Sequence, residues 1–296
     1  MESGNMRYLA PKTVTEAAQL LADSDGIARV LAGGTDLLVQ MKAETIAPDL
    51  LVDIKHIPGM REITAEAGGW RIGAAVPGAH ISEHAGLKAD WPGVVEAAAL
   101  IGSTQVQGRA SIVGNLCNAS PAADSVPALV AADARVQITG PKGTRDCAVI
   151  EIPVGPGKTT LQRGEIVTAV LLPARTGIGA DACLRFIPRT EMDIAVCSAA
   201  VNVTLDESGR CSAARVALGA VAPVVLLVEE AADILVGSRL DRATLERLQS
   251  VCSKAARPID DKRGTAEFRR EVVGVMARRA ARLAAERATA KAGEKA

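Results

Sequence analysis

Residues 111–133 read SIVGNLCNASPAADSVPALVAAD, and this stretch decides how we interpret the rest of the chain. Its first half is small, polar and glycine-bearing, while its second half is an apolar run typical of a buried helix. A helix start leaves backbone N–H groups unpaired, and these groups favour a phosphate. Asn115, Asn118 and Ser120 add short polar side chains that donate hydrogen bonds at close range. We interpret the stretch as half of a cradle for a dinucleotide.

Composition narrows the class of protein. A chain of 296 residues predicts two or three domains, and aromatic residues at 2% mean that their cores consist of Ala, Val, Leu and Ile. A formal net charge of +0 predicts no general attraction to nucleic acid or to an anionic membrane. No apolar run reaches the roughly 18 residues of a membrane helix. Because the first twelve residues also lack a signal-peptide pattern, we expect a soluble, cytoplasmic protein without a membrane span.

Cysteine and histidine spacing predicts neither a metal site nor a catalytic nucleophile. The six cysteines form no C-x-x-C pair, which argues against zinc and against an iron–sulfur cluster held by this chain alone. Scattered buried thiols in a reducing compartment are the expected alternative. The histidines are His56, His80 and His84, and no cysteine or carboxylate pattern accompanies them.

The first 176 residues predict two α/β units. A capping-box pattern at Thr13 and Glu16 starts a helix, and residues 1–55 further predict strands at 29–31 and 51–54 around a helix at 37–41. Residues 56–176 form the second predicted unit. Its expected elements are a strand at 70–74, helices at 79–87 and 91–101, a strand at 135–138, and short strands within 145–173 around a turn-rich loop at 153–164.

The composition changes after Pro173, which predicts a further domain at 177–288 behind a linker at 175–180. The expected elements are antiparallel strands at 183–187, 194–206 and 213–220, followed by helices at 227–236, 241–256 and 265–288. We expect residues 289–296 to be a disordered tail. The predicted fold class is therefore α+β, with two N-terminal α/β subdomains and a C-terminal domain of antiparallel sheet with helices.

A second glycine-bearing segment, residues 32–36 (AGGTD), lies between a predicted strand and a predicted helix. Two glycines let the backbone approach a ligand, and the following N–H groups with the Thr35 hydroxyl suit phosphate oxygens. The alternative is a simple turn. The segment matches neither the G-x-x-x-x-G-K-[ST] phosphate loop nor the G-x-G-x-x-G fingerprint, which argues against a kinase, an ATPase and a simple nicotinamide dehydrogenase. Two such segments together favour a diphosphate held from two sides.

The segments RVLAGGTDLLVQMK, LVDI, RIGAAV, SIVGNLCNASPAADSVPAL, EMDIAVCSAAV and RVALGAVAP occur in this order along the chain. Together they resemble the FAD-binding medium subunit of the molybdenum hydroxylases, the group that includes carbon monoxide dehydrogenase and xanthine dehydrogenase. The resemblance extends from about Arg7 to Arg282. It implies a PCMH-type fold in which FAD lies between the two N-terminal subdomains.

The resemblance also implies the residues that hold FAD. The diphosphate and flavin end would lie against Leu31, Ala32, Gly33, Gly34, Thr35, Asp36 and Leu37. The opposite wall, which also carries Ser120, would contribute a phosphate clamp of Ser111, Gly114 and Asn115. The flavin and adenine rings would pack on Ile101 and on Ile166 or Val167, and Arg185 would be a cation near the flavin or, alternatively, part of a surface salt bridge. Asp124 would accept from a ribose or ribityl hydroxyl, with a helix N-cap as the alternative.

Two departures from the family pattern affect cofactor binding. Val113 stands where relatives carry the first of two glycines, and a β-branched residue there restricts the backbone, so phosphate contact would be looser. No histidine stands at Gly34–Thr35, where some related folds bond flavin covalently, and this predicts dissociable FAD.

The implied function is electron transfer. A molybdenum-cofactor large subunit would oxidise the substrate, a [2Fe-2S] small subunit would pass electrons to FAD on this chain, and an external acceptor would take them. A dimer of heterotrimers is the implied assembly. The alternatives are a self-contained FAD-dependent reductase and a scaffold subunit that has lost FAD, which Val113 alone supports. The sequence names neither the substrate nor the acceptor (NAD, quinone or oxygen).

Overall fold

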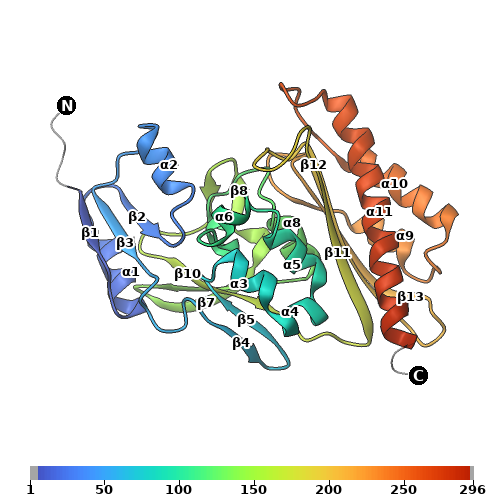
Figure 1. Ribbon diagram of the computed structural model, residues 1–296, viewed down its shortest axis with the longest axis horizontal. Coiled ribbons are helices and arrows are strands. Elements are labelled where there is room, and N and C mark those ends of the chain that lie inside the picture. The colour runs from blue at the N-terminus through green and yellow to red at the C-terminus, as the bar shows by residue number, and fades with distance from the viewer. Residues whose placement is uncertain (1–5, 294–296) are drawn as a thin grey trace.

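The computed structural model describes residues 6–293, and its sheets follow one another along the chain (Figure 1). The first sheet is parallel, in the order β1-β3-β2, with its strands at Arg7–Leu9, Leu50–Asp53 and Ala28–Leu31. Helices α1 (Val14–Asp23) and α2 (Leu37–Lys42) connect these strands. Strand β3 is buried along its whole length, as expected for the centre of a parallel sheet.

The cap predicted at the start of α1 is present in part. The Thr13 hydroxyl accepts the Glu16 N–H at 3.1 Å. The Glu16 carboxylate, however, accepts the N–H of Lys12 rather than that of Thr13. Helix α1 buries Ala17, Ala18 and Leu21 and packs against both the first and the second sheet.

The second sheet is antiparallel, in the order β4-β5-β10-β6-β7. Its strands span Ile63–Glu66, Gly69–Gly73, Ile166–Leu172, Arg135–Gly140 and Gly143–Ala148. Between β5 and β6 the chain forms short helices that gather beside this sheet (Figure 1). These helices are α3 (Gly78–Glu83), α4 (Ala85–Asp90), α5 (Pro92–Ala98), α6 (Thr104–Gln107), α7 (Ile112–Cys117) and α8 (Val126–Ala131). A 3₁₀ turn (Val149–Glu151) and a small ribbon of β8 (Pro153–Gly155) and β9 (Lys158–Thr159) precede β10.

The C-terminal part is an antiparallel sheet in the order β11-β12-β13-β14, covered by three helices (Figure 1). Its strands span Ile178–Phe186, Cys197–Leu205, Cys211–Gly219 and Leu226–Leu227. Helices α9 (Glu229–Leu235), α10 (Arg242–Ala255) and α11 (Ala266–Gly293) follow. α11 packs on β11 and β12, while α5 and α8 contact this sheet from the N-terminal part. One apolar cluster fills the two N-terminal sheets and another fills the C-terminal part.

Several element boundaries differ from the sequence-based expectation. The helix expected at 79–87 is two helices, α3 and α4, because His84 ends the first and caps the second through its Nδ1, which accepts the Leu87 N–H. The polar half of residues 111–133, for which no helix was predicted, contains α7. α11 continues to Gly293, so residues 289–293 are helical rather than a disordered tail, and residues 294–296 lie outside the described part. None of the helices between residues 6 and 293 combines the length and apolar character of a membrane span.

Candidate functional site

A cavity of about 1240 Å³ lies between the first sheet with α2 on one side and α7 with the start of β10 on the other. Typical small-molecule pockets span roughly 300–1,000 Å³, so this cavity suits an extended ligand such as a dinucleotide. Twelve of the residues expected to hold FAD line it. They are Ala32, Gly33, Gly34, Thr35, Asp36, Leu37, Ile101, Ser111, Gly114, Asn115, Ile166 and Val167.

The glycine loop between β2 and α2 presents backbone donors on this cavity. Gly34 has φ +79°, a conformation that favours glycine and turns the chain sharply after β2. Within residues 6–293, the N–H groups of Gly33, Gly34 and Thr35 find no acceptor in the protein. Unpaired backbone N–H groups lining a cavity are suited to phosphate oxygens.

Gly33 serves a contact within the protein. A methyl group added there would lie 2.1 Å from the carbonyl oxygen of Arg109, on the chain leading into α7. The glycine loop and the segment before α7 therefore touch, backbone against backbone. This contact joins the two predicted halves of the cradle and explains the first glycine without a ligand.

Helix α7 forms the opposite wall, and part of its polar chemistry is used internally. The Ser111 hydroxyl caps α7 by accepting the Gly114 N–H at 3.0 Å. The Asn115 Oδ1 accepts from both the N–H and the hydroxyl of Ser125, at 3.1 and 2.8 Å. Since Ser125 needs that acceptor, the amide nitrogen of Asn115 is left as the donor for a ligand.

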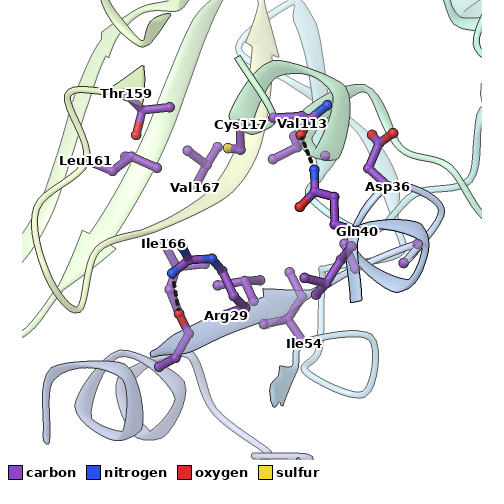
Figure 2. A pocket seen from close by; sticks show the side chains of 18 of the residues that line it. Arg29, Asp36, Gln40, Ile54, Val113, Cys117, Thr159, Leu161, Ile166 and Val167 are labelled. Carbon is purple, nitrogen blue, oxygen red and sulfur yellow. Dashed lines mark hydrogen bonds between the residues drawn. The ribbon is translucent and has the colours of Figure 1, made fainter. Parts of the chain in front are cut away.

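Apolar side chains from β10 and α7 form the cavity wall opposite the glycine loop. Ile166 and Val167 are buried, and in Figure 2 Val167 lies beside Cys117 while Ile166 lies beside Arg29. The pairing of β10 with β6 shifts register between Val167 and Ala169, and such a bulge re-aims side chains beside a site. Val113 is only 4% exposed and belongs to the core, and the cavity is large despite its branched side chain.

Asp36 stands at the N-terminal end of α2, and its carboxyl group makes no capping hydrogen bond. Partial desolvation raises the pKa of Asp36 above its ordinary value. Although the side chain of Asp36 is exposed, this partial desolvation favours its neutral form, which limits repulsion of an anionic ligand.

Four expected residues do not line the cavity: Leu31, Ser120, Asp124 and Arg185. Asp124 and Arg185 form a buried ion pair with Oδ1 and Nη1 2.9 Å apart. Arg185 also donates to the carbonyl of Leu100, so it connects β11 to the N-terminal part instead of forming a surface salt bridge. Burial raises the pKa of Asp124, although Arg185 opposes the shift. The N-cap alternative for Asp124 does not hold, because Ser125 occupies that position of α8.

Sequence reasoning missed many residues that line the cavity. Those with polar, sulfur-bearing or apolar side chains from β2, α2, α7 and the loop before β10 include Arg29, Gln40, Cys117, Thr159, Leu161, Gln162 and Arg163. Gln40 follows Asp36 by one helical turn, so helical spacing places both on one face and could have found it. Arg29 lies in β2 just before the glycine loop and its side chain is directed toward the cavity (Figure 2). The loop at 157–164 carries no periodic pattern that would have placed its residues.

The cysteines are all free thiols, and residues 6–293 contain no group of three His, Cys, Asp or Glu side chains suited to a metal. Burial raises the pKa of the Cys117 thiol to about 12. A thiol that stays protonated is a poor nucleophile, so Cys117 contributes packing rather than covalent chemistry.

Two family models match the chain. The model described as FAD binding domain in molybdopterin dehydrogenase matches residues 4–175, and the CO dehydrogenase flavoprotein C-terminal domain matches residues 182–284. Together they define the class as a flavin-binding subunit of a molybdenum-dependent dehydrogenase.

Individual relatives match along almost the whole chain. The carbon monoxide dehydrogenase medium chain of Afipia carboxidovorans is 33% identical, with 97% of this chain and 99% of the relative covered. The xanthine dehydrogenase FAD-binding subunit of Escherichia coli O157:H7 is 31% identical, with 92% and 93% covered. A solved structure of reconstituted CO dehydrogenase from Oligotropha carboxidovorans matches with a TM-score of 0.91 at 33% identity, covering 97% of this chain and 100% of that one. The chain belongs to the family of FAD-binding medium subunits of molybdenum hydroxylases, and FAD is its cofactor.

The residues around the cavity fit this cofactor. Free N–H groups in the glycine loop and the Asn115 amide provide donors on two sides, which suits a diphosphate. Ile101, Ile166 and Val167 provide apolar surface for flat rings. Among the described residues that line the cavity there is no histidine, and dissociable FAD stays a prediction.

Proposed function

We propose that this chain is the electron-transferring FAD subunit of a molybdenum hydroxylase complex. Its partners are a large subunit with the molybdenum cofactor and a small subunit with [2Fe-2S] clusters, assembled as a dimer of heterotrimers. An external acceptor takes the electrons. The observation that carries the proposal is the large cavity lined from two walls by the expected residues in a chain of this family.

FAD supplies a redox centre that accepts electrons singly and releases them as a pair. The protein residues bind and orient it. The free backbone N–H groups of Gly33, Gly34 and Thr35 and the side-chain amide of Asn115 hold the diphosphate. Ile166 with Val167 packs on a ring and excludes water. With Cys117 protonated, the described cavity lining contains no thiolate or histidine to act as nucleophile. This supports electron transfer over covalent catalysis.

Leu31, Ser120, Asp124 and Arg185 have a less direct part in the proposal. The Asp124–Arg185 pair lies next to Leu100, which precedes the cavity residue Ile101. We propose that the pair holds in place the cavity wall that carries Ile101. Direct contact of FAD with Leu31, Ser120, Asp124 and Arg185 stays a prediction. The free thiols agree with a reducing compartment, and we place the complex in the cytoplasm on that basis.

The two alternative functions make different predictions. A scaffold subunit would have a closed cradle, whereas the cavity measures about 1240 Å³ with Val113 in place. A self-contained reductase would need a proton donor near the flavin. Asp36 is the cavity carboxyl group with a raised pKa, and its place beside the proposed diphosphate donors suits binding better than proton donation.

The visible absorption spectrum of the purified chain tests the proposal first, followed by identification of any flavin released on heating. We expect yellow protein that releases FAD, and reduction of that FAD when the reduced small subunit is added in a stopped-flow experiment. Protein that stays colourless with added FAD, alone and with its partners, supports the scaffold. Yellow protein that a small-molecule substrate reduces without partner subunits supports the self-contained reductase.

A further inference from the structure

Helix α2 and the turn after it, residues 36–47, form a thin wall of the FAD cavity. Asp36, Leu37 and Gln40 line the cavity from α2, and residues 44–47 line it from the turn. α2 itself buries none of its residues. Leu38 and Val39 are 52% and 64% exposed, so this wall has little apolar packing to hold it in place.

One hydrogen bond fastens this wall to the other side of the cavity. The Gln40 Nε2 donates to the Asn118 Oδ1 at 3.2 Å, and the two residues are 78 positions apart. Figure 2 shows the bond as the link between Gln40 on α2 and the end of α7 near Val113 and Cys117. Within residues 6–293, no other side-chain hydrogen bond or ion pair joins 36–47 to the opposite wall.

The two ends of this bond differ in how firmly they are held. Asn118 caps the C-terminus of α7, and its own N–H donates to the Gly114 carbonyl at 2.9 Å. α7 in turn buries Ile112, Val113 and Leu116 in the core. Gln40 is on the weakly packed side, where the turn is closed by local bonds: Thr45 donates to the Gln40 carbonyl, and Glu44 donates to the Met41 carbonyl. A break in the Gln40–Asn118 bond therefore frees residues 36–47 and leaves α7 in place.

We propose that the Gln40–Asn118 hydrogen bond is a clasp that holds residues 36–47 over bound FAD and sets the rate at which FAD leaves. The inference rests on the proposed role of this cavity as the FAD site. Gln40 and Asn118 are positioning residues in this scheme. The clasp opens for FAD exchange and closes when the cofactor is seated, so its loss speeds release without changing what the cavity recognises.

The test measures FAD release from the holoprotein after mixing with excess apo-D-amino-acid oxidase, an FAD-binding apoprotein, as a trap. We expect Gln40→Ala and Asn118→Ala each to release FAD about fivefold faster, because a neutral hydrogen bond contributes about 1 kcal/mol. The double variant should be no faster than the single variants, since both remove the same bond. The swap Gln40→Asn with Asn118→Gln should restore slow release. Val39→Ala, on the same helix but outside the cavity lining, is the matched control.

A second readout is independent of the cofactor. Trypsin cleaves after Lys42, the last residue of α2, only when this segment opens. We expect faster cleavage there in both single variants, with and without FAD, and an unchanged rate in Val39→Ala. The clasp proposal is wrong if both single variants release FAD and are cleaved at Lys42 as slowly as the wild type. It is also wrong if the double variant releases FAD faster than either single variant by the product of their effects. If the wild-type chain never retains FAD, the proposed function is wrong rather than the clasp. The cleavage rates at Lys42 in the wild type and the variants then still test whether the clasp exists.

Discussion

The glycines of the cavity differ in what each one does for the site. Gly34 allows a turn at positive φ, while Gly33 allows the glycine loop to touch the chain before α7. A methyl group added at Gly114 would lie 3.2 Å from the Ser111 hydroxyl oxygen. This contact is tight, but the Ser111 side chain can move to relieve it. Gly33 is therefore the position where a small change most directly separates the two walls.

Gly33→Ala should lower both FAD retention and the free energy of unfolding. The new methyl group would lie 2.1 Å from the Arg109 carbonyl oxygen, so two backbone segments must separate. We expect a loss of about 1–3 kcal/mol, the usual cost of overpacking, together with colourless or weakly yellow protein. Denaturant unfolding and flavin absorbance measure the two effects.

Gly108→Ala is the control for that variant. It lies on the same chain segment, in a helical conformation, and its added methyl group would be 3.5 Å from the Gln105 carbonyl oxygen, an ordinary van der Waals contact. It should keep the cofactor and unfold as the wild type does or slightly later. Equal behaviour of the two alanine variants contradicts the assignment of Gly33 to the contact between the walls.

Asp36 should make FAD affinity depend on pH. Partial desolvation raises the pKa of this carboxyl group, and its ionised form would repel a diphosphate held by the glycine loop as we propose. FAD should therefore bind more tightly as pH falls through the raised pKa, and Asp36→Asn should flatten this dependence and bind more tightly at neutral pH. Fluorescence titration of the apoprotein with FAD across pH measures the effect. If the pH dependence of FAD affinity is the same in Asp36→Asn as in the wild type, Asp36 is not the group responsible.

Local turn chemistry indicated the glycine loop, and the family resemblance implied Ser111, Gly114 and Asn115; all of these residues line the cavity. Neither could predict that Asp124 and Arg185 pair with each other. That pair depends on how the C-terminal sheet packs on the N-terminal part. The lining residue Arg163 lies 139 positions from its partner, the Ser24 carbonyl, and no local pattern reports such a contact.

At the scale of elements, α7 shows where propensity misleads. Residues 111–118 contain glycine, serine and asparagine, which disfavour helix interiors, and no helix was predicted there. Ile112, Val113 and Leu116 are buried, and this tertiary burial together with the Ser111 cap outweighs the propensity. The long periodic segments behind α10 and α11 were predicted within a few residues, apart from the C-terminal end of α11.

Helix α11 lies on the C-terminal sheet through a face of small residues. Its buried positions include Ala277, Ala280, Ala281, Ala284 and Ala288. Small side chains let the helix axis approach β11 and β12 closely, and no space is left for larger ones.

Ala280→Leu should therefore destabilise the C-terminal part by about 1–3 kcal/mol, because Ala280 is completely buried. Ala290→Leu, at an exposed position of the same helix, should change the free energy of unfolding by less than about 0.5 kcal/mol. Urea denaturation followed by circular dichroism compares the two. A leucine accommodated at position 280 without cost would mean that α11 packs less tightly than the burial of its alanines indicates.

At the scale of the whole molecule, arginines connect the two parts of the chain. Arg175 stacks 3.5 Å over Trp91 and donates to Asp181 at 2.6 Å, while Arg287 on α11 pairs with Glu96 on α5. Arg287 also donates to the Asp181 carbonyl at 2.8 Å. The predicted boundary at 176/177 falls beside this junction, and the gap between the two family matches lies at 175–182. The sequence showed a change of composition there, but not the ionic contacts, which form only after both parts have folded.

Asp181 should make the stability of this junction depend on pH. Its Oδ2 accepts the Val94 N–H at 3.1 Å, and Arg175, Glu96 and Arg287 are the charged groups around it. Burial raises the pKa of Asp181 to about 6. Between the unfolded pKa, 3.8, and this value the folded state holds a proton that the unfolded chain has lost. The stability contributed by the protonated carboxyl group is therefore complete below the unfolded pKa and is lost as pH rises through about 6.

Comparison with Asp181→Asn isolates this effect from the other carboxyl groups. Asp53, Glu165 and Asp193 have lowered pKa values and destabilise the fold as pH falls, which is the opposite dependence. Because the asparagine does not titrate, the wild type should lose about 1 kcal/mol relative to Asp181→Asn between about pH 5 and about pH 7.5. Urea midpoints at each pH measure the difference. If instead the wild type gains stability relative to the variant over this range, the Arg175 charge outweighs burial, and the junction is held by an ionised pair at neutral pH.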